Sequence, residues 1–454
     1  MNLVEAYKKR LVISESVYSR SHGGAKMDNN RKLATAKCLQ NVEKFLNEAF
    51  DNSVGTQRSD MGMFKKFCLN LTTVALPNLI ANELVIVQPM SSMTGYVTYI
   101  QYTAGSNKGA TTRGDVLNDP FKLGKVDPSY TSSAVTENKT ITTAGAGTTS
   151  TVGWAPVYSV KKVTVNGSEV TEVTSGSPSA GQYTIDKTTG TITFGTALQN
   201  NDELQVAYVY DNVVIPQNDL PIVNAEMKSI SLLAHARRVA VYYSQIAAYQ
   251  AKTDYGFDLG DQLAEKAVGQ LSYEIDTEVT DLLIDHAEQL ADLAWSKTLP
   301  VGVSKTEHYE GFTEVVEIAR QKIYDATKRF APNYMLCASD VLPVLTFIKG
   351  FSAASTGQIN GPYFAGTLNG LKVFVTPNIA PGHFVIGVNG NDMMSSAAVY
   401  APYMAIVPTQ LLQYADGGTS QGWSTLYDLK ALNTYEKDGH EYSNLLVQGM
   451  ITAW

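Results

Sequence analysis

The segment LPNLIANELVIVQPMSSMTGYVTYI, residues 76–100, is the part of the sequence that decides the fold. An apolar stretch passes through a Gln-Pro pair at residues 88–89 and reaches a polar turn at residues 91–95. The chain leaves this turn as YVTYI, residues 96–100, which has the residue types and the alternation of a β-strand. A projecting ribbon with an apolar base needs another surface to cover it, so the segment predicts a protein that assembles with other chains.

The composition limits the class of protein. The 454 residues are enough for a large core and for two or three domains. Charged residues make up 17% of the chain, below the roughly 25% that is typical of soluble domains. A folded chain with so little charge either covers much of its surface with other chains or is a large β protein rich in Thr and Tyr. The composition alone leaves both readings open.

The net charge of −8 is unevenly distributed. Residues 1–66 contain 12 Lys and Arg and 7 Asp and Glu, so this segment carries +5 and the remainder carries −13. A basic arm on an acidic body is typical of an arm near an acidic partner or nucleic acid, but also of an ordinary solvated arm, which we favour. The acidic body argues against wrapping DNA as the primary function, because neutralising phosphates needs a high density of cations.

The cysteines and the apolar runs indicate the compartment. Cys38, Cys68 and Cys337 lie far apart, are odd in number and form no CxxC pair, so we expect no disulfide framework and a reducing cytosol. The first ten residues lack the apolar core of a signal peptide. No run of about 18 apolar residues occurs in the sequence, so we expect no membrane span.

The N-terminal part is expected to be an arm over residues 1–60, loosely ordered over residues 1–30. Residues 1–30 are polar and are interrupted by two glycines. Leu39, Val42 and Leu46 then recur at the spacing of an amphipathic helix.

The middle of the chain predicts a small inserted domain. Residues 131–151 are rich in Thr, Ser, Gly and Ala, which is typical of a linker. Residues 152–212 contain short strands that end at turn residues, and Asn166-Gly167 is a strong hairpin signal because both positions tolerate positive φ. We expect a small all-β sandwich or barrel here.

The C-terminal half predicts a long helix followed by an α/β lobe. Asp258 can act as an N-cap, and apolar residues then recur every three or four positions as far as Leu293. A helix over residues 258–293 has a length of about 45–50 Å. Helical and strand patterns alternate from residue 312 to residue 407, which predicts a compact lobe around a sheet. The whole chain is therefore predicted to be an α+β protein.

The sequence contains no convincing catalytic or metal-binding constellation. The six histidines do not stand at metal-ligand spacing, and HExxH, P-loop and EF-hand patterns are absent. Glu274, Asp276 and Glu278 could act as acid and base, but we interpret them as a solvated helix face. His286 is interpreted as a core or interface residue. We therefore predict a protein that is not an enzyme and that has no cofactor and no metal.

Several segments resemble one family, the major capsid proteins of T-even-like tailed bacteriophages. Residues 76–100 are similar to a Pro-Asn-Leu-Ile, Val-Gln-Pro-Met and Thr-Gly run of that family. Later segments that resemble the family are YMLCASDVLPVL at 334–345, FAGTLNGLKVFV at 364–375 and VYAPYMAIVP at 399–408. The likeness covers most of residues 60–120 and 225–415.

The resemblance implies the tailed-phage capsid fold, also called the Johnson or Hong-Kong-type fold. Its parts are an N-terminal arm, an extended β-loop, a peripheral domain with a long spine helix, and an axial domain, here with an inserted small all-β domain. The implied boundaries are 1–60 for the arm, 61–130 for the start of the peripheral domain with the extended loop, 131–215 for the inserted domain with its linker, 216–311 for the peripheral domain with the spine helix, 312–430 for the axial domain, and 431–454 for a return to the peripheral domain.

The function that the resemblance implies is that of a major capsid protein, assembled as hexamers and pentamers into an icosahedral or prolate shell around the phage genome. Implied partners are other copies of the chain, portal and scaffold or decoration proteins, and indirectly the packaged double-stranded DNA, with no membrane. The implied location is the virion, after synthesis in the cytoplasm of the bacterial host. Two alternatives share the fold: a pentamer-only vertex protein of the same phages and a bacterial shell that encloses a cargo.

Two further expectations concern particular residues. We expect Met90, Met93, Val97, Tyr99 and Ile100 to contact a neighbouring subunit, the methionines because a flexible thioether adapts to slightly different sites. The family also implies removal of an N-terminal segment after a Leu/Ile-x-Glu pattern. The stretches 13–15 (ISE) and 46–48 (LNE) match it loosely, and since the chain covers residue 1 onward we expect that cleavage to be absent or incomplete.

Overall fold

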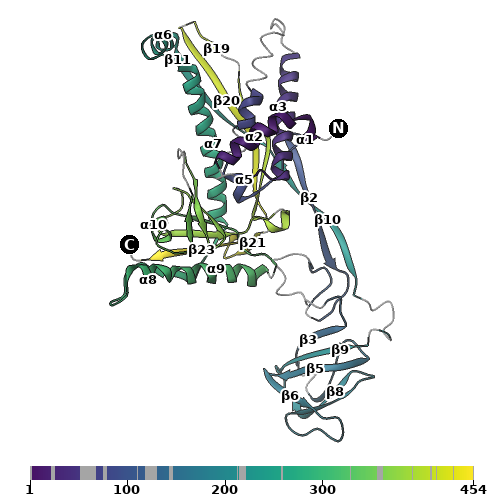
Figure 1. The fold of residues 1–454 in the computed structure, drawn as a ribbon. Helices are drawn as coiled ribbons and strands as arrows, with labels where there is room; N and C mark the ends of the chain where they lie inside the picture. Colours follow the sequence, from purple (N-terminus) through teal and green to yellow (C-terminus); the bar gives the residue numbers. More distant parts are fainter. Residues whose placement is uncertain are drawn as a thin grey trace. The chain divides into compact units, whose positions relative to one another are not determined.

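The computed structural model of the chain describes residues 3–21, 26–51, 68–74, 79–109, 111–117, 130–142, 147–211, 213, 221–256, 259–327, 329–354, 361–390, 392–409, 412–415, 417–432 and 434–452. Two compact units make up the chain. The larger unit comprises Met1–Val97 and Ser229–Trp454, and the smaller unit comprises Thr98–Lys228. Helices and sheets occur together in the larger unit (Figure 1).

A five-stranded sheet forms one part of the larger unit. Its strands are β1 (Ile86–Val87), β18 (Ala398–Pro408), β20 (Gly418–Ala431) and β11 (His235–Ser244) in that order, with β19 (Leu412–Gln413) also paired to β20. β1 runs parallel to β18, whereas β18, β20 and β11 are mutually antiparallel neighbours.

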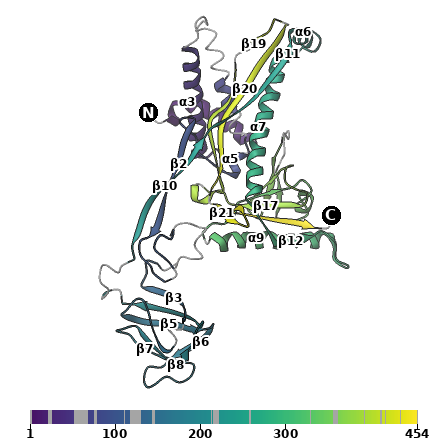
Figure 2. The same cartoon turned by 180° about the vertical axis from the view of Figure 1, so that it is seen from behind.

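Two long helices, α3 (Asn29–Asp51) and α7 (Leu259–Asp285), cover opposite faces of this sheet. Helix α3 packs in one apolar cluster with Leu426 of β20, whereas α7 packs in another with Trp423 of the same strand. These two residues are three positions apart, and side chains on a strand alternate between the faces, so they point to opposite sides. Figures 1 and 2 show the two helices on either side of β20.

The other large sheet of the larger unit has seven strands. Its order is β12 (Glu288–Ser296), β23 (Leu446–Thr452), β17 (His383–Gly387), β13 (Tyr334–Cys337), β16 (Leu371–Val375), β15 (Tyr363–Leu368) and β14 (Phe351–Ala353). Helix α9 (Phe312–Thr327) buries Val315, Val316, Ala319 and Ile323. The ring of Phe312 meets that of Phe384 on β17 edge-on, with centroids 5.3 Å apart.

Shorter elements complete the larger unit. They are α1 (Leu3–Ala6), α2 (Lys8–Ser21), α5 (Ala81–Leu84), α6 (Gln245–Gln250), the π-helical turn η3 (Ala251–Tyr255), α8 (Lys305–Glu310), α10 (Leu342–Leu345), the 3-10 turn η4 (Met393–Ser395) and the paired strands β21 (Thr434–Lys437) and β22 (His440–Ser443). Cys38, Cys68 and Cys337 are free thiols and are buried.

The smaller unit contains an all-β domain. Its strands are β3 (Ala134–Thr140), β9 (Glu203–Tyr210), β5 (Val157–Val165), β6 (Ser168–Glu172), β7 (Gln182–Asp186), β8 (Thr191–Leu198) and β4 (Gly147–Thr151), in that spatial order. They enclose an apolar core of their own that includes Val163, Ile192 and Tyr208. As the sequence predicts, Asn166 and Gly167 form the β5–β6 turn, both with positive φ (49° and 79°).

Strands β2 (Thr94–Ala104) and β10 (Val223–Leu233) pair as a two-stranded sheet, which we call the ribbon. They run side by side along their length in both views (Figures 1 and 2). The ribbon begins later than the segment 76–100 suggests, because residues 81–84 form helix α5 and residues 86–87 pair with β18. Leu76 to Asn78 lie outside the described residues.

Two expectations about local structure are wrong. Residues 3–21 are helical rather than loosely ordered, because Leu11, Ser14 and Tyr18, spaced three and four apart, are buried against the rest of the unit. The stretch 131–151 is not a plain linker. Thr-rich strands β3 and β4 form the two ends of the β domain's strand order, and β3 pairs with β9 over its whole length.

The long helix is also shorter than its pattern. It ends at Asp285, and Leu293 belongs to β12, which pairs in parallel with β23. The proposed N-cap Asp258 lies outside the described residues. The pattern continues past the helix end because alternate residues of β12, Leu293 and Trp295, are buried as well.

In the C-terminal half, the sheet that each strand joins differs from the predicted domain boundaries. β18 and β20 lie within residues 312–430, yet they join β11 in the five-stranded sheet. β23 lies within 431–454, yet it pairs with β17 and β12 in the seven-stranded sheet. Pairing between distant strands, which a local pattern does not report, decides both cases.

Candidate assembly surface

Strand β2 divides its side chains sharply between its two sides. Val97 is 2% exposed, whereas Tyr96, Ile100 and Tyr102 are 72%, 52% and 44% exposed. Because successive side chains of a strand point to opposite faces, the even-numbered residues from Tyr96 to Tyr102 form one face, which is exposed.

Strand β10 is exposed on both faces over residues 223–229 and becomes buried only near its C-terminal end. Met227 and Val223 are 76% and 45% exposed, whereas Leu232 is 3% exposed. The hydroxyl of Thr103 on β2 donates to the carboxylate of Glu226 on β10 at 3.4 Å, so odd residues of β2 share a face with even residues of β10. The other face of the ribbon is therefore made by Ile100, Tyr102, Val223 and Met227, which we call the outer face.

The outer face is apolar and carries no charged side chain among these described positions. The charges nearby on β10, Glu226 and Lys228, lie on the opposite face by parity and pair with each other at 3.3 Å. Apolar, aromatic and Met side chains without charge are the composition of the centre of a protein–protein interface.

The base of the ribbon is held by an apolar cluster in the larger unit. We call it the root cluster; it contains Leu39, Val42, Leu46, Met90, Val97, Leu232 and Ala234. The backbone N–H of Met90 donates to the carbonyl of Pro402 at 3.0 Å, and that of Ala234 donates to the carbonyl of Met93 at 2.8 Å. The ribbon is thus anchored at its base, whereas the side chains of its outer face are exposed.

The five residues proposed from the sequence fall into two groups. Met90 and Val97 are 4% and 2% exposed and pack within their own chain. Met93 and Ile100 are 51% and 52% exposed, and Tyr99 is partly buried on the face opposite Ile100. Only Ile100 belongs to the outer face, so a neighbour that covers this face does not reach Val97 or Tyr99.

Sequence reasoning missed the other members of the outer face. Tyr102 continues the parity of Ile100, so the alternation of β2 alone could have found it. Val223 and Met227 could not be found in this way, because nothing in the sequence pairs residues 223–233 with residues 94–104.

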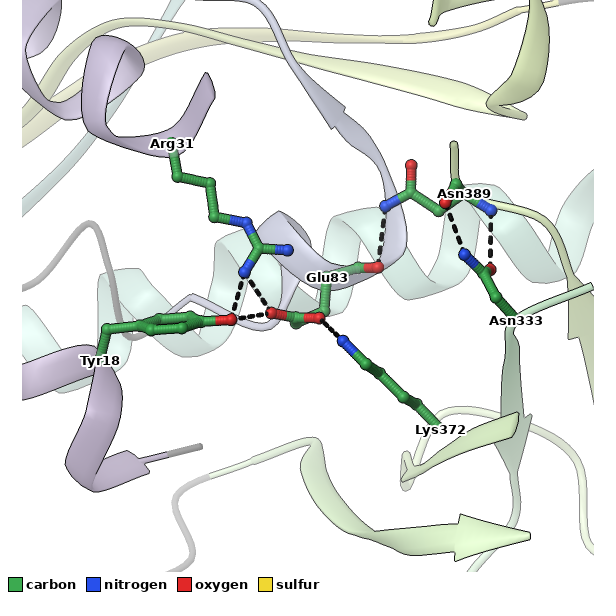
Figure 3. A network of polar contacts seen from close by, with 6 residues as sticks. All are labelled: Tyr18, Arg31, Glu83, Asn333, Lys372 and Asn389. Atoms are coloured by element: carbon green, nitrogen blue, oxygen red, sulfur yellow. Dashed lines mark hydrogen bonds and ion pairs between the residues drawn. The ribbon is translucent and has the colours of Figure 1, made fainter. Parts of the chain in front are cut away.

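A buried carboxylate, Glu83 on α5, connects the N-terminal helices to the seven-stranded sheet (Figure 3). Its side chain is 2% exposed and forms ion pairs with Arg31 of α3 and Lys372 of β16. Tyr18 of α2 donates its hydroxyl proton to the same carboxylate. Burial alone raises the pKa of Glu83, but the charge of Arg31 and the hydrogen bonds from Arg31 and Lys372 outweigh it and lower the pKa to about 2.

The backbone of Glu83 is held as well. Its carbonyl accepts a hydrogen bond from the side-chain amide of Asn389 at 2.8 Å. Asn389 in turn exchanges two hydrogen bonds with Asn333, which precedes β13 (Figure 3). The short helix α5, next to β1, is therefore fixed to the seven-stranded sheet through both its side chain and its backbone.

Two carboxylates of α7, those of Asp276 and Glu278, bind other groups of the chain. The interpretation of a solvated helix face is therefore wrong for these two. Asp276 is 8% exposed and accepts a hydrogen bond from the backbone N–H of Ala81 at 3.0 Å. Burial raises the pKa of Asp276 to about 7. Glu278 forms a two-pronged ion pair with Arg237 at 2.9 and 3.0 Å and accepts from Tyr427 at 2.7 Å.

Within the described residues, no group of three or more His, Cys, Asp or Glu side chains is arranged to hold a metal ion. In the same part of the chain, no helix has the length and apolar character needed to cross a membrane.

Comparison with known proteins identifies the family. The family model described as major capsid protein Gp23 matches residues 61–449. The chain belongs to the Gp23 family of major capsid proteins. It is 23% identical over 395 residues to the major capsid protein of Enterobacteria phage T4, which covers 78% of this chain and 73% of the T4 protein. It is 24% identical over 225 residues to the protein of Enterobacteria phage T6, covering 43% of this chain and 44% of that protein.

Solved structures give more distant likenesses. A chain from Microbacterium phage Oxtober96 has a TM-score of 0.37 at 11% identity and covers 82% of this chain and 91% of its own. An encapsulin complex from Synechococcus elongatus gives a TM-score of 0.31 at 11% identity, covering 50% of this chain and 77% of its own. The family assignment rests on the sequence match, which spans most of the chain.

Membership of the Gp23 family establishes the general function of the chain, which is that of a capsid protein. The chain is a structural protein of the phage virion and not an enzyme, as the sequence predicts. A capsid protein acts as one of many copies in a shell, so self-association is part of this function.

Proposed function

We propose that copies of this chain assemble into hexamers and pentamers through the outer face of the ribbon, and that these close an icosahedral or prolate shell around the phage genome. In this proposal the ribbon is the extended loop of the tailed-phage capsid fold and α7 is its spine helix. The seven-stranded sheet with α9 forms the axial domain, and the five-stranded sheet belongs to the peripheral domain. The β domain is the insertion.

The observation that carries the proposal is the exposure of the uncharged, apolar outer face of the ribbon. A two-stranded sheet is at best marginally stable in water without a further surface to pack on. The root cluster supplies such a surface for one face near Val97 and Leu232. Ile100, Tyr102, Val223 and Met227 lie on the other face, and only a neighbouring copy of the chain is present in every position of a shell to cover them.

The side chains of the outer face suit contacts that differ slightly between hexamers and pentamers. Met227 is 76% exposed, and its flexible thioether can fill slightly different gaps in hexamers and pentamers. A weak interface that is repeated around a closed ring is sufficient, because symmetry multiplies each contact.

Further partners follow from the same proposal. A shell that packages DNA needs a portal and either a scaffold or decoration proteins, and the acidic body favours indirect rather than wrapped contact with double-stranded DNA. We propose synthesis in the cytoplasm of the bacterial host. The three buried free thiols are compatible with a reducing compartment.

The test is electron microscopy of the purified full-length protein, alone and coexpressed with the phage scaffold. Closed particles with six-fold and five-fold capsomers are the expected result. A protein that stays monomeric at high concentration, with the scaffold present, would contradict the proposal.

Two alternatives give different outcomes of the same experiment. A pentamer-only vertex protein would occupy only the five-fold positions and would need a second protein for the faces. A cargo-enclosing shell would contain a co-purified protein and no DNA when isolated from infected cells.

A further inference from the structure

The far end of the ribbon is closed by contacts between the residues that follow β2 and those that precede β10. The N–H of Gly105 donates to the carbonyl of Ile222 at 2.7 Å. The N–H of Ile222 donates to the hydroxyl of Ser106 at 3.2 Å. A Cβ on Gly105 would lie 2.7 Å from Cγ2 of Ile222, so glycine is needed for this close approach. The two strands are therefore tied together where the ribbon meets the β domain.

Tyr130 connects this end of the ribbon to the start of the β domain. It lies shortly before β3 and is 4% exposed. Its hydroxyl accepts a hydrogen bond from the N–H of Ser106 at 3.3 Å and donates to the carbonyl of Ile222 at 2.9 Å. One side chain at the entrance of the β domain thus contacts the ends of both ribbon strands.

Lys108 makes a second connection, through a buried charge. The side chain is 1% exposed, and its Nζ donates to the carbonyl of Tyr130 at 2.8 Å and to that of Ser132. The ammonium group also lies 5.3 Å from the centroid of the Tyr210 ring, at the end of β9. An ammonium group that is removed from water is costly unless nearby groups compensate for the lost hydration. The buried position of Lys108 therefore depends on these contacts.

The loop that carries Lys108 is itself fixed to β2. The backbones of Lys108 and Thr111 exchange two hydrogen bonds, of 2.9 and 3.0 Å. The chain then returns beside β2, where the N–H of Ala104 donates to the carbonyl of Asp115 at 2.8 Å. The ammonium group of Lys108 is thus supplied by the end of the ribbon, whereas its acceptors belong to the β domain.

The points at which the chain enters and leaves the β domain are also bonded to each other. The N–H of Tyr210 donates to the carbonyl of Ser133 at 3.0 Å, and the hydroxyl of Tyr210 donates to the carbonyl of Ser132 at 3.4 Å. Entrance and exit thus form one attachment, and Lys108 contacts both. Domains that are joined only by linkers usually move relative to each other, so contacts of this kind are what can fix an orientation.

We propose that Lys108 and Tyr130 form a rigid joint, with Lys108 as its positioning residue, so that the β domain and the far end of the ribbon move as one body. The β domain then has one fixed direction relative to Tyr102 and Met227 of the outer face. A partner that binds the β domain therefore meets the outer face in one orientation. The inference concerns the single subunit and does not rest on the proposed shell.

The test measures the distance between two nitroxide labels in the unassembled full-length subunit by pulsed electron paramagnetic resonance. The labels are attached at Met227→Cys on the outer face and at Tyr158→Cys on β5, where both natural side chains are exposed. The three natural cysteines are buried and do not compete for the label. A reference pair, Tyr158→Cys with Ser168→Cys, lies wholly within the β domain, since Ser168 pairs with Val165 at the other end of β5.

The test variant is Lys108→Met, which keeps an unbranched side chain but removes the charge and its donors. Lys161→Met is the matched control, because Lys161 is exposed on β5. In the wild type we expect the distances between residues 227 and 158 to be distributed as narrowly as those of the reference pair. Lys108→Met should widen this distribution on the order of twofold, because domains without a fixing interface move relative to each other. The reference pair should stay unchanged, and Lys161→Met should match the wild type.

A wild-type distribution clearly broader than that of the reference pair would overturn the proposal, as would an unchanged distribution in Lys108→Met. A role of Lys108 in stability alone would lower the urea midpoint without widening the distribution. If Lys108→Met does not fold, Tyr130→Phe keeps the ring but removes the hydroxyl that contacts Ser106 and Ile222, and the same widening is expected. Failure of the chain to form shells would count against the proposed function and not against the joint, because the measurement uses single subunits.

Discussion

The sharpest prediction concerns the double substitution Ile100→Asp with Met227→Asp on the outer face. The two side chains are 52% and 76% exposed. Fully burying a side chain of this size contributes about 1.5–3 kcal/mol, so covering their exposed parts contributes about 1 and about 2 kcal/mol. Losing about 3 kcal/mol weakens each contact about 100-fold. The two new carboxylates would also have to be desolvated, which weakens the contact further.

The isolated subunit should tolerate the same change. Substitutions of exposed side chains usually alter the free energy of unfolding by less than about 0.5 kcal/mol. We therefore expect a soluble variant with the denaturation midpoint of the wild type but without closed particles in sedimentation or electron microscopy. Tyr158→Asp is the matched control, because Tyr158 is 71% exposed on the β domain and away from the outer face. Normal particles from the double variant would refute the reasoning, as would loss of particles from the control.

Three other predictions concern stability. Glu83→Gln should lower the free energy of unfolding at pH 7 by about 3 kcal/mol, measured by urea denaturation with Glu317→Gln as the control. The folded pKa of Glu83 is lowered to about 2. The stability that this charge adds is therefore complete above about pH 4.5 and is lost as the pH falls toward 2. Burial raises the folded pKa of Asp276 to about 7, so the free energy of unfolding of the wild type should fall as the pH rises from about 4 to 7. Asp276→Asn should remove this pH dependence and should be more stable than the wild type at pH 8 by about 2–4 kcal/mol. An unchanged pH dependence in the variant would contradict the raised pKa of Asp276. Replacing residues 134–210 by a flexible linker should leave the larger unit folded, whereas deleting only 152–212 should give insoluble protein because β3 and β4 lose their partners; circular dichroism and solubility distinguish the two.

Local signals in the sequence predicted those elements that depend on local chemistry. The β5–β6 turn follows from Asn166-Gly167, since both residues adopt positive φ. Helix α9 follows from the helical spacing of Val315, Ala319 and Ile323, which the structure buries. In each case the residues that carry the signal are also those that make the structure.

The errors arose where distant segments decide the structure. The apolar spacing of α7 runs on into β12, and only the pairing of β12 with β23 ends the helix at Asp285. Strands β3 and β4 are poor in apolar residues and read as linker, but β3 pairs with β9 and β4 with β8. Helix α2 looks weak in isolation because the partners of Ser14 and Tyr18 lie at Thr73 and Glu83.

The assembly surface shows the same limit at the level of single side chains. The sequence placed the candidate residues on one strand, but it grouped Val97 and Tyr99 with Ile100, although alternate residues of a strand have opposite roles. One face of β2 is buried with α3 and fixes the ribbon in its own subunit, and the other is left exposed. In the proposed assembly, the residues that anchor the ribbon differ from those that bind a neighbour, but the strand register links the two sets. A shift of one residue in β2 would expose Val97 and bury Ile100, so both anchoring and the proposed binding depend on the pairing of β2 with β10. The base of the ribbon is fixed within its own subunit, by a buried core and by the hydrogen bond from the side-chain amide of Asn41 to the carbonyl of Met90, so the register does not depend on contacts with other subunits.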